Sequence, residues 1–511
     1  MAKKSSKKFG ILLCALILAV IVGCQSVGGL NLNDMILKQI DVSQQEQSQL
    51  FELEIEFNEE LISREEPEIA SMVKEFSKIS LNIAHAKMDE QGNQWINGVF
   101  GFGKGDIPFT LHSDSKTVRF DIDGSKRPLI IELPDTDPAL EQSQQAMAET
   151  IRQLAQKVAA YFVRGLPNPP VLSVDRVSSS VHGVLTNLTK VHAELNGEQL
   201  GDLIPVYLEN LMNDKEGLRT TLREVFQWAQ ELPPEVLSVF GEGADAVLEE
   251  DADIDAVVEE AFAELIPVLE EAQAEIAKAR EEEEWGEIFD KGVTMAADLY
   301  VDDSLHLRKS FVELIIAPAF FTAEDSPVRS IKIRSSGEMW NVNGDVVVPQ
   351  VEVPGNALTV EEAEGLQGYQ ALRLFEPSSV LYNVLKNDFK IDDQSFVLSD
   401  EWGIPFYVDS DGTAYVPIRA TMKEFGVKLQ VPAAKGQIRF YDQATEQAVI
   451  FQTGSAKANV NGKSVTLEHK VVNDGHFVYV SADDLFGILH AEYSVSDNES
   501  GERIMEVARD L

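Results

Sequence analysis

Two short sequences carry the residue types used for acyl transfer through a serine nucleophile. Ser113 and Lys116 form an SxxK spacing, and Ser496, Asp497 and Asn498 form SDN. A serine acyl-enzyme site of this kind also needs a KTG sequence, which the chain lacks, and a helix that presents the serine and lysine together. Ser113 instead lies where the pattern predicts a hairpin turn. We therefore interpret both sequences as chance coincidences.

The histidines show no spacing typical of a metal site. Eight of them are scattered along the chain: His85, His112, His182, His192, His306, His469, His476 and His490. HExxH and similarly close pairs are absent. His469, His476 and His490 could converge near the C-terminal end, but surface or turn roles fit them better. We predict neither a metal nor a cofactor.

Three groups of aspartates could suggest calcium, and each has a simpler explanation. Asp251, Asp253 and Asp255 alternate as in an EF-hand, but Ala256 and Phe262 occupy the positions that need glycine and glutamate. A charged helix face is the preferred interpretation, and weak cation binding is the alternative. The acidic residues within 121–124 and 409–412 fit hairpin turns better than calcium loops.

The residues before Cys24 predict export from the cytoplasm. Four lysines among residues 3–8 precede an apolar stretch that ends at residue 23. This stretch is short for a membrane-spanning helix, which needs about 20 apolar residues. A basic start followed by a short apolar core is typical of a signal peptide. We assign the signal peptide to residues 1–23.

The sequence IVGC at residues 21–24 resembles the lipobox of bacterial lipoproteins. The resemblance implies that the Cys24 sulfur receives diacylglycerol, that cleavage follows Gly23, and that Cys24 becomes the mature N-terminus. Lipidation would anchor the protein on the extracytoplasmic face of the cell membrane. An ordinary signal peptide or an uncleaved anchor is the alternative. The other cysteine, Cys14, lies within the predicted signal, so no disulfide is expected in the mature chain.

Length and charge limit the partners. A chain of 511 residues has room for two or more domains, and its net charge of −42 disfavours nucleic acid and anionic lipid heads. Acidic residues concentrate between residues 242 and 290. Apolar residues recur there at partly helical spacing, which predicts a solvated helical hairpin or a long helix rather than a disordered tail.

The first part of the chain predicts one sheet interrupted by helices. Residues 51–133 alternate apolar with polar residues and contain turn signals, a pattern typical of an antiparallel meander with one wet face. A helix is predicted from about residue 138 to 165, followed by the strand VHAELNG and helices around LIPVYLENLM and LRTTLREVFQW. Alternation resumes over residues 295–333. The acidic helices are therefore predicted to be inserted between strands of the same sheet.

Such a curved sheet with helices over its concave face resembles periplasmic lipoprotein-carrier proteins and related lipid-binding lipoproteins. The resemblance is architectural and covers residues 41–348. It implies an apolar ligand held between sheet and helices. Residues 24–40 are predicted to form a tether. Residues 349–390 are predicted to form a connector with some helix, including a helix start at Thr359.

The C-terminal region, residues 391–511, contains one pattern twice. DGTAYVPIRATMKEFGVKLQV begins at Asp411 and DGHFVYVSADDLFGILHAEYSV at Asp474, so that Tyr415 and Val416 correspond to Tyr479 and Val480. Each copy predicts a turn, a strand, a helix and a second strand.

These residues resemble the copper amine oxidase N-terminal-like domain, also called the stalk domain. The second copy departs from that family at residues 481–483, where proline, leucine and arginine are usual. The resemblance implies a fold, not an oxidase. An oxidase builds its cofactor from a tyrosine that follows asparagine and binds copper through a His-x-His pair, and the chain has neither.

The expected fold class is α+β: an N-terminal curved antiparallel sheet with an inserted acidic helical section, then a two-repeat stalk-type domain. The expected function is non-enzymatic binding or scaffolding at the cell envelope, through the lipid anchor and an envelope polymer or protein. A carrier or sensor of a lipid or other apolar ligand is the first alternative. A hydrolase that depends on carboxylates is the second.

Overall fold

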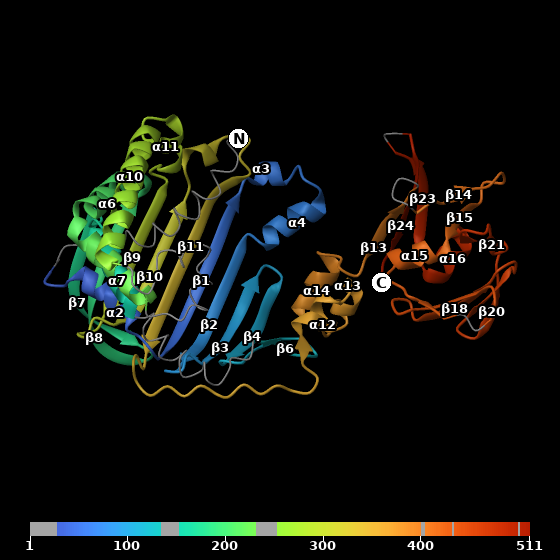
Figure 1. The fold of residues 1–511 in the computed structure, drawn as a ribbon, viewed down its shortest axis with the longest axis horizontal. Coiled ribbons are helices and arrows are strands. Elements are labelled where there is room, and N and C mark those ends of the chain that lie inside the picture. The colour runs from blue at the N-terminus through green and yellow to red at the C-terminus, as the bar shows by residue number, and fades with distance from the viewer. Residues whose placement is uncertain (1–27, 134–152, 231–252, 400–403, 432–433, 499–500) are drawn as a thin grey trace. The chain divides into compact units, whose positions relative to one another are not determined.

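The computed structural model describes residues 28–133, 153–230, 253–399, 404–431, 434–498 and 501–511. Cys24 and the predicted signal peptide lie outside these residues, as do Asp251 and the start of the helix predicted from residue 138. The described chain forms two compact units, one with residues up to 123 and 128–357, the other with residues 124–127 and 358–511 (Figure 1). Both units combine helices with strands, so the predicted α+β class is confirmed.

One antiparallel sheet forms the framework of the first unit. The order of its strands is β6-β5-β4-β3-β2-β1-β11-β10-β9-β8-β7. The strands are β1 (Gln45–Phe57), β2 (Lys78–Met88), β3 (Gln94–Phe102), β4 (Gly105–Ser113), β5 (Thr117–Ile122), β6 (Leu129–Glu132), β7 (Val171–Val181), β8 (Val184–Asn196), β9 (Val293–Val301), β10 (Leu307–Ile316) and β11 (Val328–Trp340). The predicted meander over residues 51–133 is confirmed as β1 to β6.

The middle of this sheet joins strands that are far apart in the sequence. β1 pairs with β11, with Leu53 opposite Ile333. The alternation of apolar and polar residues predicts each strand. It cannot predict that β1 pairs with β11, because nothing in the sequence near either strand identifies a partner so far away along the chain. Strand β7 was not predicted at all, since its serine-rich second half, SSSV, has few apolar residues.

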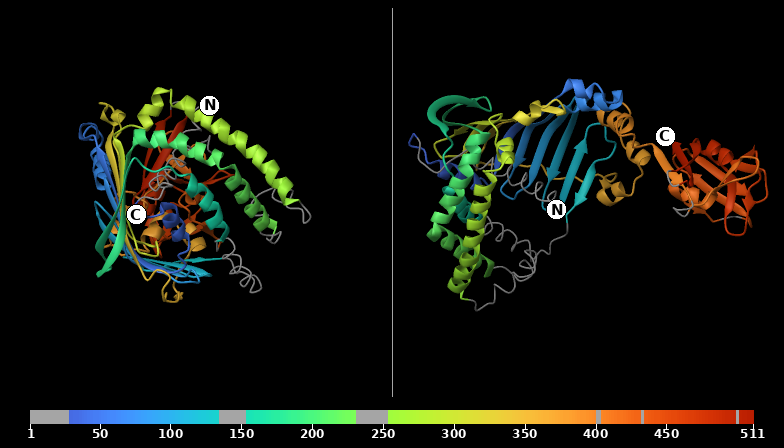
Figure 2. Two further views of the ribbon diagram at one scale, coloured as in Figure 1. Left: turned by 90° about the vertical axis from the view of Figure 1, so that its left-hand side faces the viewer. Right: turned by 90° about the horizontal axis from the view of Figure 1, so that it is seen from above.

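Helices inserted between β8 and β9 cover part of one face of the sheet. Figure 2 shows them on one side of the curved sheet. They are α6 (Gly197–Asn213), α7 (Lys215–Gln230), α10 (Ile254–Ala279) and α11 (Glu283–Ile288), while α2 (Leu32–Ile40) packs nearby. Since β8 and β9 are neighbours in the sheet, the predicted insertion of helices between strands is confirmed.

The covered face, here called the inner face, carries the core of the first unit. Val191 of β8 and Met295 of β9 are buried against Leu200 of α6 and Leu32 of α2. Asn196 starts α6 with a capping box. The Asn196 side chain accepts the backbone N–H of Gln199, and the Gln199 side chain accepts the backbone N–H of Asn196. The opposite face of the sheet is called the outer face.

The acidic section forms a long solvated helix in its described part. α10 lies against α7, where Arg219 contacts Glu259 at 2.7 Å and Arg223 contacts Asp255 at 2.8 Å. Asp253 caps the helix by accepting the N–H of Asp255, which fits the preferred helix-face interpretation. The neutralising arginines come from α7, outside the acidic run, so composition alone could not place them. In the described residues, no helix is both long and apolar enough to cross a membrane.

Short elements mark the ends of the strands. α3 (Glu59–Ile62) and α4 (Pro67–Glu75) connect β1 to β2, and a 3-10 turn, η3 (Ala319–Thr322), connects β10 to β11. α4 begins with proline in its first turn, where the missing N–H costs no hydrogen bond. These elements lie at the end of the strands opposite Trp340, the last residue of β11.

The second unit begins with helical segments. It contains β12 (Leu358–Thr359), α12 (Val360–Glu364), α13 (Gly368–Leu372) and α14 (Val380–Asn387). The hydroxyl of Thr359 accepts the N–H of Glu362 and caps α12, which confirms the predicted helix start. The four residues 124–127 also belong to this unit, and within it the N–H of Lys126 donates to the Leu374 carbonyl.

Three small sheets and two helices complete the second unit. The sheets are β13-β24-β23, β14-β15-β22-β21 and β16-β17-β18-β19-β20. Their strands are β13 (Gln394–Leu398), β14 (Tyr407–Val408), β15 (Ala414–Pro417), β16 (Leu429–Gln430), β17 (Gln437–Asp442), β18 (Gln447–Gln452), β19 (Lys457–Val460), β20 (Lys463–Thr466), β21 (Val472–Asn473), β22 (Val478–Ser481), β23 (Glu492–Asp497) and β24 (Arg503–Arg509). The helices are α15 (Ile418–Glu424) and α16 (Ala482–Leu489).

The internal repeat is visible in this unit. β15 followed by α15 corresponds to β22 followed by α16, as predicted from the two copies. The helices end at equivalent residues, Gly426 and His490, both with positive φ (71° and 54°). Phe425 of the first copy and Phe486 of the second share the buried core. A buried ion pair between Asp442 and Arg509 then links β17 to β24.

Candidate ligand-binding surfaces

Part of the inner face of the first unit is apolar and uncovered by the described helices. Over β8 and β9 the inner-face side chains are buried under helices, but over β1 to β5 they are half-buried or exposed. Phe51 of β1 is 37% exposed although it lies in the same cross-strand row as buried Ala297. The half-buried side chains include Leu53, Ile79, Leu81, Phe100, Phe109 and Phe120.

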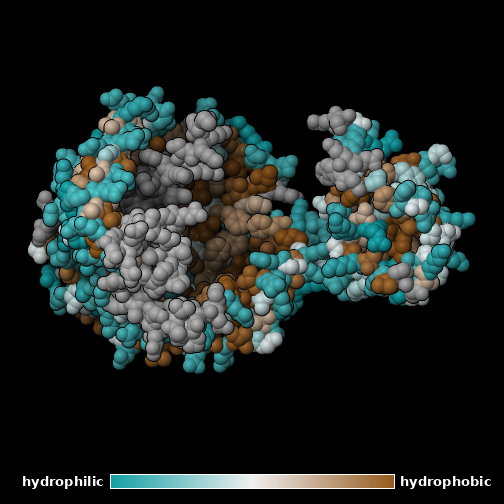
Figure 3. Space-filling view, viewed as in Figure 1, coloured by the Kyte–Doolittle hydropathy of each residue, from teal (hydrophilic) through white to brown (hydrophobic). Residues whose placement is uncertain are grey.

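This region is called the open apolar face. Figure 3 shows apolar residues lining the hollow of the first unit beside the helices. A contiguous apolar surface of this kind is uncommon on a soluble protein unless something binds there. The predicted apolar ligand would contact this surface.

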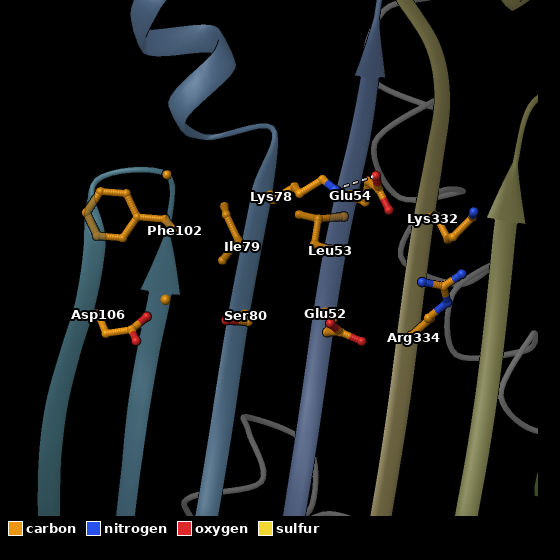
Figure 4. A pocket seen from close by; sticks show the side chains of 12 residues that line it. Glu52, Leu53, Glu54, Lys78, Ile79, Ser80, Phe102, Asp106, Lys332 and Arg334 are labelled. Atoms are coloured by element: carbon orange, nitrogen blue, oxygen red, sulfur yellow. Dashed lines mark ion pairs between the residues drawn. The ribbon is translucent and has the colours of Figure 1, made fainter.

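The outer face carries a shallow pocket of mixed charge (Figure 4). Its volume is about 440 Å³, and its lining includes Asp106, Lys332 and Arg334. Lys78 contacts Glu54 at 3.0 Å. The hydrogen bond and charge of Lys78 lower the pKa of Glu54, so this carboxylate is ionised and poorly suited to act as a general acid.

A row of aromatic rings crosses the outer face near the end of β11. This tryptophan–histidine row consists of Trp340, His85, Trp95, His112 and His182. Ring centroids are 5.4 Å apart for His85 and Trp340, 5.5 Å for His85 and Trp95, and 6.4 Å for Trp95 and His112. His182 stacks on Trp340 at 3.8 Å. The rings come from β2, β3, β4, β11 and the β7–β8 turn.

A tight turn brings His182 to the row. His182 and Gly183 connect β7 to β8 and both have positive φ, which is the geometry of a type I′ hairpin turn. The backbone N–H of His182 donates to the Glu338 carboxylate at 2.8 Å. Burial raises the pKa of Glu338, but this bond and Lys309 outweigh burial and leave the pKa below its usual value.

Polar groups surround the rings. His85 Nε2 lies 2.5 Å from a Glu46 oxygen, and the Asn341 amide donates to the other oxygen. Burial raises the pKa of Glu46, but the bonds from Asn341 and His85 more than compensate and lower it overall. Burial, assisted by the charge of Arg119, lowers the pKa of His112. The His112 Nδ1 is buried and has no hydrogen-bond partner.

A polar hollow lies beside the row. Ser48, Asn82, Ser336 and Lys309 line a pocket of about 250 Å³ together with Glu338. Glu338 and Trp340 are on the same strand and face the same side, as do Ser48 and Glu46, so the hollow continues the row along the strands. Aromatic faces and hydrogen-bonding groups are thus adjacent.

The second unit has its own aromatic patch, formed by Tyr407, Tyr415, Tyr479 and Phe477. Tyr407 stacks on Tyr415, and its ring centroid is also 5.0 Å from that of Tyr479. Tyr407 is 38% exposed and Phe477 40%. Burial raises the pKa values of Tyr407 and Tyr415, and neighbouring phenols and aspartates add to the effect. Their hydroxyls therefore stay protonated at neutral pH.

The candidate catalytic sequences lie in different units. Ser113 ends β4 in the first unit, and Ser496 and Asp497 are on β23 in the second. Asp114, between Ser113 and Lys116, accepts the N–H groups of Lys116 and Thr117 in a hairpin turn, as predicted.

The candidate calcium residues take part in other interactions. Asp409 accepts the N–H groups of Asp411 and Thr413, which confirms the hairpin turn there. Asp121 instead lies within β5 and pairs with Arg119 at 2.8 Å. Across the described residues, no group of three or more His, Cys, Asp or Glu side chains is placed to hold a metal ion.

The three C-terminal histidines occupy separate positions. His469 contacts Thr413, His476 follows the turn at Asp474, and His490 ends α16.

The sequence did not predict the tryptophan–histidine row. One signal was available: in QWINGVFGF, Trp95 alternates with Ile96 and so belongs to the polar face, where a large aromatic residue has no core to fill.

Residues 401–501 match the family model of the copper amine oxidase N-terminal domain. No curated protein and no solved structure matches the chain. The match covers a non-catalytic domain of the oxidases and none of their catalytic part. The second unit extends beyond it on both sides, through β13 before the match and β24 after it.

Proposed function

We propose that this chain is a lipid-anchored protein on the extracytoplasmic face of the cell membrane, where it binds an envelope polymer or protein without catalysing a reaction. The predicted lipobox supports the anchor at Cys24. The observation that carries the binding function is the exposed aromatic patch of the second unit, at Tyr407 and Phe477. Exposed tyrosine and phenylalanine side chains provide large contact areas for a partner.

Two measurements test this proposal. Cells that express the full chain should incorporate labelled palmitate, and Cys24→Ala should abolish the labelling. The detergent-solubilised full chain should retain a purified cell-wall fraction or an envelope protein, and the double variant Tyr407→Ala, Phe477→Ala should retain much less. Tyr441→Ala is the matched control, because Tyr441 is 44% exposed and lies elsewhere in the same unit. Equal retention by both variants would remove the aromatic patch as the binding surface.

The open apolar face favours a second candidate function, the binding of a lipid or another apolar molecule. Burial of a fully exposed phenylalanine or leucine side chain contributes about 1.5–3 kcal/mol, so several half-buried side chains together can hold an acyl chain. This interpretation agrees with the predicted carrier or sensor. The resemblance to lipoprotein-carrier proteins remains a prediction.

The second candidate function predicts a bound lipid. Native mass spectrometry should detect it on the full chain after the protein is purified in detergent and released from the micelles. Phe51→Glu should reduce binding of a fluorescent fatty acid severalfold by placing a charge on the open apolar face. Phe311→Glu should have little effect, because Phe311 is 40% exposed on the outer face. Equal effects of the two substitutions would contradict binding at the inner face.

A further inference from the structure

We propose that the tryptophan–histidine row is a binding platform for an uncharged glycan chain of pyranose rings. This inference goes beyond the proposed function, because it names a ligand class for the outer face of the first unit and does not depend on lipid at Cys24. It rests on the arrangement of the rings, the polar groups beside them and the hollow that continues the row.

The row has no core-forming role on its face. Trp95 and Trp340 lie on the outer face, while the described helices that pack against this sheet contact the inner face. Both tryptophans are half-buried, so part of each side chain is accessible. Cross-strand aromatic pairs can stabilise a sheet by about 1 kcal/mol or less, which accounts for single contacts between rings. It does not account for polar groups gathered around them.

Pyranose chemistry matches this combination of groups. A sugar ring has an apolar face of C–H groups that can lie on an aromatic ring, and hydroxyls at its rim that donate and accept hydrogen bonds. Beside the rings, the Asn341 amide donates one hydrogen to Glu46, and His85 contacts the other carboxylate oxygen. The second amide hydrogen of Asn341 and the further lone pairs of the carboxylate are the groups that a sugar hydroxyl can use.

The extent of the row fits a polymer better than a single small molecule. Successive ring centroids lie 5.4 to 6.4 Å apart from Trp340 across to His112, with interplanar angles of 42° to 87°, so the rings form a strip of alternating faces and edges and not a cage. His182 closes one end by stacking on Trp340. Arg119 lies next to His112 at the other end of the row, and its guanidinium donates to the Glu352 carbonyl. A quaternary ammonium ligand would need rings on several sides of one point.

Charge argues for an uncharged glycan. The net charge of the chain is −42, and Glu46 at the centre of the row is ionised at neutral pH because its pKa is lowered. A polyanion would be repelled. The adjacent hollow supplies Ser48, Asn82 and Ser336, whose neutral polar side chains suit sugar hydroxyls and acetamido groups. Its two charged residues, Lys309 and Glu338, pair with each other at 3.0 Å.

The test is a fluorescence titration of the full chain in detergent with cellotetraose and with tetra-N-acetylchitotetraose. At least one should shift the tryptophan emission and bind saturably. Trp95→Ala should weaken that binding about tenfold or more, as expected for an aromatic residue at the centre of an interface. Trp95→Phe, which keeps a ring, should retain most of the affinity. Phe320→Ala is the control, since Phe320 is 47% exposed at the opposite end of the strands.

Three results would overturn the proposal: no saturable binding of either glycan, equal weakening by Phe320→Ala and Trp95→Ala, or tighter binding of a proline-rich peptide at the same rings. If Trp95→Ala lowers the melting temperature, His85→Ala and Trp95→Phe decide the question, because a merely structural role predicts unchanged affinity in every folded variant. A cell-wall fraction retained through Tyr407 and Phe477, with no effect of Trp95→Ala, would reject this inference and leave the proposed function intact.

Discussion

Val416 and Val480 lie directly opposite each other in neighbouring antiparallel strands, and both side chains are fully buried. Tyr415 faces Ser481 on one side of this pair, and Pro417 faces Tyr479 on the other. Because Tyr479 is the repeat equivalent of Tyr415, the two pairings are related by exchange of the copies. The pair therefore marks a local two-fold relationship, and the two repeats share one core.

Equivalent positions should have equivalent effects on stability. We expect Val416→Ala and Val480→Ala each to lower the free energy of unfolding by about 2 kcal/mol, since each removes buried methyl groups and leaves a small cavity. The change in the free energy of unfolding is measured by urea unfolding, with hydrogen exchange of the second unit as the readout. Val431→Ala, at a residue 87% exposed, should change stability by less than about 0.5 kcal/mol. A large difference between the two buried variants would contradict the shared core.

The buried ion pair of the second unit should be sensitive to the loss of one partner. Arg509 contacts Asp442 at 2.6 Å, with both side chains almost fully buried, and its guanidinium lies over the Phe425 ring. Arg509→Met should cost about 3–5 kcal/mol, because it leaves a buried carboxylate without its counter-charge.

Replacing both partners is the matched control. Asp442→Leu combined with Arg509→Met should recover much of that stability, since no charge remains buried. Arg176→Ala, which breaks an exposed contact with Asp303, should cost less than about 1 kcal/mol. A double variant no more stable than Arg509→Met alone would show that the hydrogen bonds of Asp442 to its own turn dominate.

The end of α16 offers a stabilising substitution. His490 has φ 54°, a left-handed conformation that costs a non-glycine residue about 1–2 kcal/mol. His490→Gly should therefore raise the free energy of unfolding by about 1 kcal/mol. In the first copy, Gly426→Ala should lower it, because a Cβ there also meets the Gln367 side chain. Thermal unfolding of the two variants checks both signs.

The stability of the first unit should depend on pH through His112. Burial holds its pKa below the ordinary value of 6.5, so the folded protein binds this proton less readily than the unfolded chain. Its contribution is fully present above pH 6.5 and is lost as the pH falls toward the lowered pKa. His112→Gln should reduce the loss of stability between about pH 7 and about pH 5. An unchanged pH profile in urea unfolding would contradict this assignment.

The sequence predicted what repeats locally and missed what depends on distant partners. Alternation identified β1 to β6, and the duplicated motif identified the two-repeat domain. The sequence pattern did not predict that Arg219 and Arg223 of α7 neutralise the acidic helix α10. These ion pairs form only when the two helices pack together. The tryptophan–histidine row was missed for the same reason. Its rings come from strands whose register is set by pairing, above all that of β1 with β11.

That central pairing also orders the assembly of the first unit. β1 to β6 follow one another along the sheet, as do β9, β10 and β11, so each group can form from short-range contacts. Until residues 328–340 are available, β1 and β10 are two unprotected sheet edges, which are liable to pair with other chains. A nascent or truncated chain that stops before Val328 should therefore be far more prone to aggregate than the complete protein. Strand β11 protects the first unit from aggregation, because it covers the exposed edges of both β1 and β10.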